Sequence, residues 1–170
     1  MSSDTSQPWW KLLDRYHWFV FAVASLAWLF DCLDQQLFII ARNFAITALM
    51  PNADPAVQKE WGGLTTAIFV LGWATGGLIF GAVGDRIGRA KTLTLTVLLY
   101  SVFTGLSALS RNEIDFAIYR FVTGLGVGGV FGLAVALVAD SLPDQARPHA
   151  LGLLQALSAV GNVTAGPTGI

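Results

Sequence analysis

The sequence contains few charged residues. Only 12% of its 170 residues are charged, whereas about 25% is usual in soluble globular domains. Hydrophobic residues make up 54% of the chain and the mean hydropathy is +0.60. This balance excludes an ordinary soluble domain and indicates a membrane protein. The ten Lys and Arg residues are scattered and the formal net charge is −1, so a nucleic acid partner, which requires a concentrated excess of positive charge, is also excluded.

Residue types that build reactive sites are equally scarce. A single cysteine, Cys32, excludes an internal disulfide framework. The two histidines, His17 and His149, are too far apart to show metal-ligand spacing. No nucleophile stands beside a base in any recognisable pattern. We therefore expect neither an enzyme nor a resident metal or cofactor.

Long apolar runs are abundant instead. About 20 mostly apolar residues are needed to cross about 30 Å of hydrocarbon, and the runs are continuous rather than alternating as in a barrel strand. The predicted fold is therefore an all-α, multi-pass membrane protein, with an N-terminal segment over residues 1–15 and a helix bundle over 16–170. Five transmembrane segments are expected, near residues 18–40, 62–84, 92–109, 116–139 and 150–170.

The basic residues between these segments predict an orientation. Cations are enriched on the cytoplasmic side of membrane proteins. Residues 41–61 contain Pro51 and Pro55 and are expected to form an external loop. The N-terminus is then cytoplasmic and the chain lies in the cell (inner or plasma) membrane. The six cations of the inner side are Lys11, Arg15, Arg86, Arg89, Lys91 and Arg147, and the three of the outer side are Arg42, Lys59 and Arg111.

Residues 81–91 form the most specific motif. They read GAVGDRIGRAK and lie between the second and third predicted segments. This pattern resembles the signature loop of the major facilitator superfamily of secondary transporters. The resemblance implies a cytoplasmic latch that takes part in gating. The matching residues are Gly81, Asp85, Arg86, Gly88, Arg89 and Lys91.

The fourth segment carries small residues at every fourth position. Gly124, Gly128 and Gly132 form a stripe between Arg120 and Asp140, which predicts close packing of another helix. The segment resembles the arginine-and-glycine motif of the fourth helix in the same superfamily. Residues 140–152 resemble the linker into its fifth helix, so that Asp140 and Arg147 are expected to belong to the gating motif. Pro148 stands where sugar porters usually have glycine.

Two acidic residues interrupt the first segment. Asp31 and Asp34 lie about 20 and 24 Å into it, three residues apart, and Gln35 is a polar neighbour. A charge in mid-membrane costs about 2.5–3.5 kcal/mol and needs a partner or a wet cavity. Arg120 lies at a similar depth, so we predict that it pairs with the aspartates. A buried carboxylate beside a second one binds a proton more readily, which makes these residues candidates for proton coupling and substrate binding. The alternative is an ion pair that only joins two helices.

The D-x-x-D pattern of Asp31 and Asp34 resembles proton symporters of aromatic acids, sialic acid and related metabolites, although Cys32 replaces their usual glycine. The resemblance implies a small-molecule substrate and protons as partners. That superfamily has two six-helix halves, so we expect an N-terminal fragment of a secondary transporter whose C-terminal half is missing. A sugar porter fragment and a small non-transporting membrane partner protein are the alternatives.

Overall fold

The chain folds into a bundle of helices. A computed structural model describes residues 9–165, with only the backbone described for residues 9, 158 and 160–165. It confirms the predicted all-α class. The elements are a short 3₁₀ helix, η1 (Trp9–Leu12), and five α-helices, namely α1 (Arg15–Leu49), α2 (Pro55–Ile87), α3 (Arg89–Ser107), α4 (Glu113–Ser141) and α5 (Arg147–Ala165).

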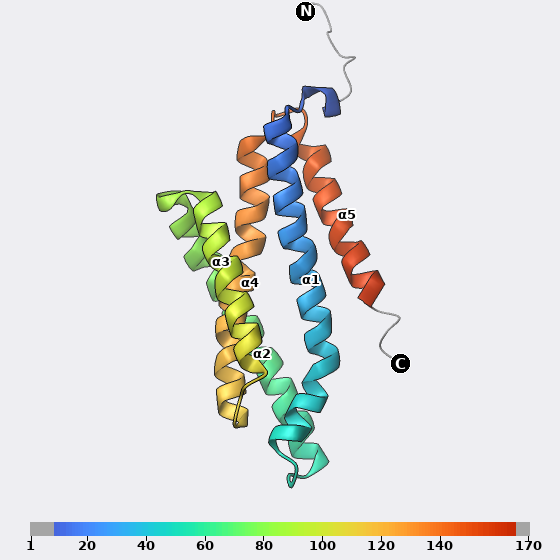
Figure 1. The fold of residues 1–170 in the computed structure, drawn as a ribbon, viewed down its shortest axis with the longest axis vertical. Coiled ribbons are helices and arrows are strands. Elements are labelled where there is room, and N and C mark those ends of the chain that lie inside the picture. Colours follow the sequence, from blue (N-terminus) through green and yellow to red (C-terminus); the bar gives the residue numbers. More distant parts are fainter. Residues whose placement is uncertain (1–8, 166–170) are drawn as a thin grey trace, which may run out of the picture.

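Helix α4 forms the centre of the bundle. It packs against α1, α2, α3 and α5, and its apolar stretch is the most buried of the four long helices. Successive helices run in alternating directions, with α1 and α5 on one side of α4 and α2 and α3 on the other (Figure 1). The buried side chains of α4, among them that of Arg120, therefore face the other helices.

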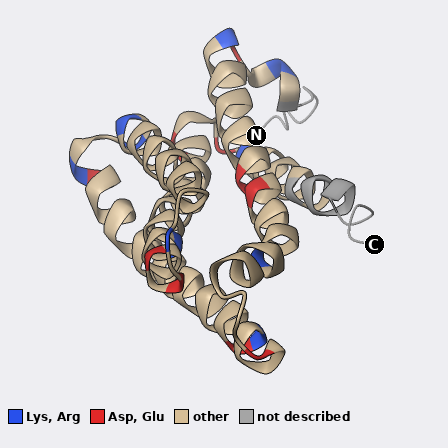
Figure 2. Cartoon of the chain, turned by 60° about the horizontal axis from the view of Figure 1, so that its bottom comes forward, with Lys and Arg blue, Asp and Glu red and all other residues tan. Residues whose placement is uncertain are grey.

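Four of the described helices, α1 to α4, are long and apolar enough to cross a membrane. Charged residues lie mostly at helix ends and connections, while the helix lengths between them are largely uncharged (Figure 2). Helix α5 begins the fifth predicted segment. Because part of that segment lies outside the described residues, the fifth span stays a prediction.

The connection between α1 and α2 differs from the prediction. The external loop expected over residues 41–61 is mostly helical, because α1 continues to Leu49 and α2 starts at Pro55. Proline at the first position of a helix costs no hydrogen bond, and Asp54 caps α2 by accepting from the Ala56 amide at 2.8 Å. Arg42 therefore lies on α1 and not in a loop.

Glycines bring α2 and α4 into backbone contact. A Cβ built on Gly128 would lie 2.8 Å from the carbonyl carbon of Trp73 and 2.9 Å from the amide nitrogen of Gly77. A Cβ on Gly124 would lie 3.1 Å from the amide nitrogen of Trp73. The predicted stripe stops short, however, since a Cβ on Gly132 would meet nothing within 4 Å. Gly132 is thus not needed for helix packing, and the contact of α4 with α2 next to it is made by Leu133 against Gly84.

Candidate functional site

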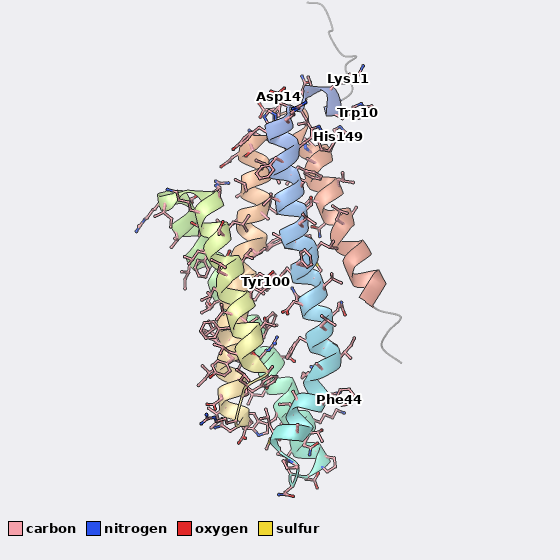
Figure 3. All side chains as sticks on the ribbon, viewed as in Figure 1. Trp10, Lys11, Asp14, Phe44, Tyr100 and His149 are labelled. Carbon is pink, nitrogen blue, oxygen red and sulfur yellow. The ribbon has the colours of Figure 1, made fainter. Side chains whose placement is uncertain are left out.

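A cavity of about 430 Å³ opens between α1, α3 and α4. We call it the arginine cavity. Its volume falls within the range of about 300–1,000 Å³ typical of small-molecule sites. Phe44, which also lines it, lies toward the end of the bundle where α1 turns into α2 (Figure 3). The residues that matter for its chemistry are Asp34, Phe38, Arg42, Thr104, Phe116 and Arg120.

Arg120 is the buried cation of the arginine cavity. Its residue is 5% exposed, and its guanidinium carbon lies 4.1 Å from the centroid of the Phe38 ring and 5.8 Å from that of Phe116. Such contacts with aromatic faces stabilise a desolvated cation. Its Nε and Nη1 atoms are nevertheless buried without a hydrogen-bond partner. Arg120 therefore keeps hydrogen-bond donors that lack acceptors, and the oxygen atoms of an anion can supply those acceptors.

The predicted direct pairing of Arg120 with the aspartates is not formed. In the described part of the chain, no ion pair within 4.0 Å joins Arg120 to Asp31 or Asp34. The physical reason is that the Phe38 ring lies against the guanidinium. Asp34 instead lines the same cavity, and its Oδ2 accepts a hydrogen bond from Thr104 Oγ1 at 3.5 Å. The Asp34 carboxyl group and the Arg120 guanidinium therefore line the same cavity without direct contact.

The two aspartates have different surroundings. Asp31 is 1% exposed, its Oδ2 accepts from Gln35 Nε2 at 3.2 Å, and its Oδ1 is buried without a partner. Asp34 is half-buried and also lines a second, largely apolar cavity of about 1040 Å³ between α1 and α3. The two carboxylates lie about 60° apart around the helix, so that neighbouring residues enclose Asp31 whereas Asp34 reaches the cavities. Asp34 is thus the accessible member of the pair.

Sequence reasoning missed Arg42 and Phe38 as residues of this site. Arg42 was expected in a loop, but it is half-buried on α1 and lines the arginine cavity. The signal was present in the spacing, because Asp31, Gln35, Phe38 and Arg42 follow one another at four, three and four residues. That spacing places all of them on one face of a helix.

The predicted gating motif lies at the junction of α2, α3 and the end of α4. Gly88 has φ of +100° and separates α2 from α3, a conformation that glycine adopts without strain. Arg89 lies 3.4 Å from Asp85 and 3.0 Å from Asp140. These contacts connect the start of α3 with the last turn of α4.

The other predicted motif residues have different places. Lys91 lines a small cavity together with Asp85 and Asp140, and Arg86 lies in the last turn of α2. A Cβ on Gly81 would meet nothing within 4 Å, so no neighbouring helix requires glycine at this position. Arg147 lies 2.7 Å from Asp144 and donates from Nε to the Leu142 carbonyl at 3.0 Å. It therefore holds the turn between α4 and α5.

Comparison with known proteins identifies the family of this chain. The family model of the Major Facilitator Superfamily matches residues 37–170. The chain is 33% identical over 88% of its length to the niacin transporter NiaP of Acinetobacter baylyi, and 29% identical over 90% to the benzoate transport protein of the same organism. It is 31% identical over 67% of its length to the sialic acid transporter NanX of Escherichia coli, of which it covers 28%. It spans about one third of the length of the two Acinetobacter proteins. The chain belongs to the major facilitator superfamily.

Proposed function

We propose that this chain is the N-terminal part of a proton-coupled symporter of small organic anions. Niacin, benzoate and sialic acid, named for its relatives, are all carboxylic acids. The observation that carries the proposal is the buried guanidinium of Arg120, whose Nε and Nη1 lack partners beside a cavity. Guanidinium and carboxylate groups match in geometry and form strong, charge-assisted hydrogen bonds. A free guanidinium favours an acid over a neutral sugar.

Asp34 is the proposed proton site. It shares the arginine cavity with Arg120 and also lines the cavity between α1 and α3. When a substrate carboxylate binds Arg120, a second anion is brought near Asp34, and like charges in a low-dielectric site favour protonation of one of them. Anion and proton then bind together. Their joint binding leaves the cavity with the same net charge that it has when empty, because the proton offsets the charge of the anion.

The proposed transport requires the rest of the protein, because the chain spans about one third of the length of its relatives. Alternating access in this superfamily involves movement of two bundles around a central site, and the chain described here supplies part of one. The proposed orientation has the N-terminus in the cytoplasm of a cell-membrane protein, so that the contacts of Arg89 with Asp85 and Asp140 lie at the cytoplasmic face. The arginine cavity then opens toward the outside.

Replacing Asp34 with Asn in the complete transporter should separate substrate movement from proton movement. We expect D34N to exchange internal for external nicotinate but to lose at least about tenfold in accumulation driven by a pH gradient, since Asn cannot carry the proton. Asp34→Glu, which keeps a carboxyl group, should retain coupling. Radiolabelled uptake and counterflow in the same vesicles measure both properties.

Asp31→Asn tests the other carboxylate in the same assay. If D31N alone loses coupling, the proton site is Asp31 and the assignment to Asp34 is overturned. Full pH-gradient dependence in both variants would show that neither aspartate carries the proton.

A further inference from the structure

Arg42 is a second cation of the arginine cavity with no assigned role. Its Nη1 donates to Thr66 Oγ1 on α2 at 2.7 Å, and its Nε is buried without a hydrogen-bond partner. A Cβ on Gly62 would lie 3.6 Å from that Nε, so the glycine leaves room for the side chain. The guanidinium is thus held on one side by Thr66 and keeps a buried donor that nothing uses.

Arg42 lies in the last part of α1, toward the end of the bundle where α1 turns into α2. It follows Asp34 by eight residues, or about 12 Å along the helix axis. Phe44, two residues beyond it, lies near that end of the bundle (Figure 3). Along α1, Phe38 separates Arg42 from the level of Asp34, and the Phe38 ring also lies against the Arg120 guanidinium. Phe38 thus lies about one helical turn from Arg42 on α1 and in contact with Arg120 of α4.

The charge of the cavity is also informative. Among its lining residues, the ionisable groups are Asp34, Arg42 and Arg120. Two cations face one acid, and the walls around them are apolar or hydroxyl-bearing. A cavity of one dominant sign with low-dielectric walls attracts ions of the opposite sign.

We infer that Arg42 is a substrate-binding residue that selects carboxylates at the outer end of the arginine cavity, before they reach Arg120. This inference rests on the proposed function. A carboxylate first contacts the Arg42 side chain, which lines the cavity, and then passes Phe38 to the buried guanidinium of Arg120. Arg42 thereby distinguishes an acid from its neutral amide, while Arg120 holds the bound anion.

The competing explanation is that Arg42 only ties α1 to α2 through Thr66. Such a tie would be equally important for acids and for neutral analogues. Nicotinate and nicotinamide form a suitable pair of probes, because they have the same ring and differ in charge. The selectivity between them is a property that a purely structural role does not change.

The experiment measures nicotinate uptake and its inhibition by nicotinamide in vesicles that contain the complete transporter. For R42Q we expect the KM for nicotinate to rise about tenfold, Vmax to change less than about twofold, and the inhibition constant of nicotinamide to stay constant. Arg42→Lys should keep most of the preference, because it keeps the charge. An unchanged KM, or an equal rise in both constants, would overturn the inference.

Two further variants make the outcome decisive. If R42Q does not accumulate in membranes, Thr66→Val serves instead, since it removes the acceptor that positions Arg42 and otherwise only the Thr66 hydrogen bond to the Gly62 carbonyl within α2. We expect T66V to raise the nicotinate KM about threefold with nicotinamide inhibition unchanged, and an unchanged KM would count against the inference. If R120Q loses affinity for nicotinate while R42Q behaves as wild type, the role of Arg42 is refuted and the proposed function stands. Wild-type affinity in R120Q would refute the proposed function itself.

Discussion

Arg120→Gln should nearly abolish transport of organic anions. Gln lacks the positive charge and cannot form a charge-assisted pair with a carboxylate, and hydrogen bonds to charged groups contribute about 1.5–3 kcal/mol each. Loss of about 3 kcal/mol corresponds to a decrease in Vmax/KM of about 100-fold. The measurement is the initial rate of nicotinate or benzoate uptake by the complete transporter, corrected for the amount of protein in the membrane.

Arg120→Lys is the matched control. It keeps the charge but loses the planar, two-pronged donor set, so we expect an intermediate loss of about tenfold. A transporter whose uptake of acids is the same in wild type, R120K and R120Q would contradict anion binding at Arg120. The contact of the guanidinium with Phe38 would then be only a packing interaction.

Gly128→Ala should strongly destabilise the bundle. The added methyl group would overlap the Trp73 carbonyl group and approach the Gly77 amide, and these are backbone atoms that cannot rotate away. Overpacking typically costs about 1–3 kcal/mol, and we expect the upper end of that range here. Thermal unfolding of the purified protein in detergent measures the change in stability. The loss of the monodisperse species with temperature is the readout.

Gly132→Ala provides the comparison within the same helix. Its Cβ would meet nothing within 4 Å, and alanine is favoured over glycine in a helix by about 1 kcal/mol. We therefore expect G132A to be as stable as wild type or slightly more so. Equal destabilisation by both substitutions would show that the α2–α4 contact is not what Gly128 provides.

The sequence was sufficient to predict the helical class and, through the pattern of residues 81–91, the superfamily to which the chain belongs. Apolar runs of membrane length have few alternatives to a helix, and the spacing of residues 81–91 is specific. The limits of α1 and α2 were not predictable from the presence of Pro51 and Pro55. Proline interrupts a helix interior but is tolerated at a first position, and only the fold shows which applies.

The sequence suggested Asp31, Asp34 and Arg120 as candidate site residues, but it indicated neither their contacts nor the presence of Phe38 and Arg42 in the same cavity. Ionisable groups within a membrane segment indicate a functional site from cost alone, which identifies Asp31, Asp34 and Arg120. Composition does not reveal that the Phe38 ring occupies the place beside the guanidinium, or that Asp31 and Asp34 face different surroundings. Those contacts depend on how α1 is rotated against α4, which no local pattern determines.

Accumulation of an organic anion driven by a pH gradient tests the central claim most directly. Proteoliposomes containing the complete transporter are given radiolabelled nicotinate at zero membrane potential, with the outside acidic or at equal pH. Liposomes with R120Q are run in parallel to measure passive entry of the protonated acid. The account predicts that wild type accumulates nicotinate well above the R120Q level with the gradient and only equilibrates without it. Uptake that requires Arg120 but is the same with and without the gradient would contradict the account.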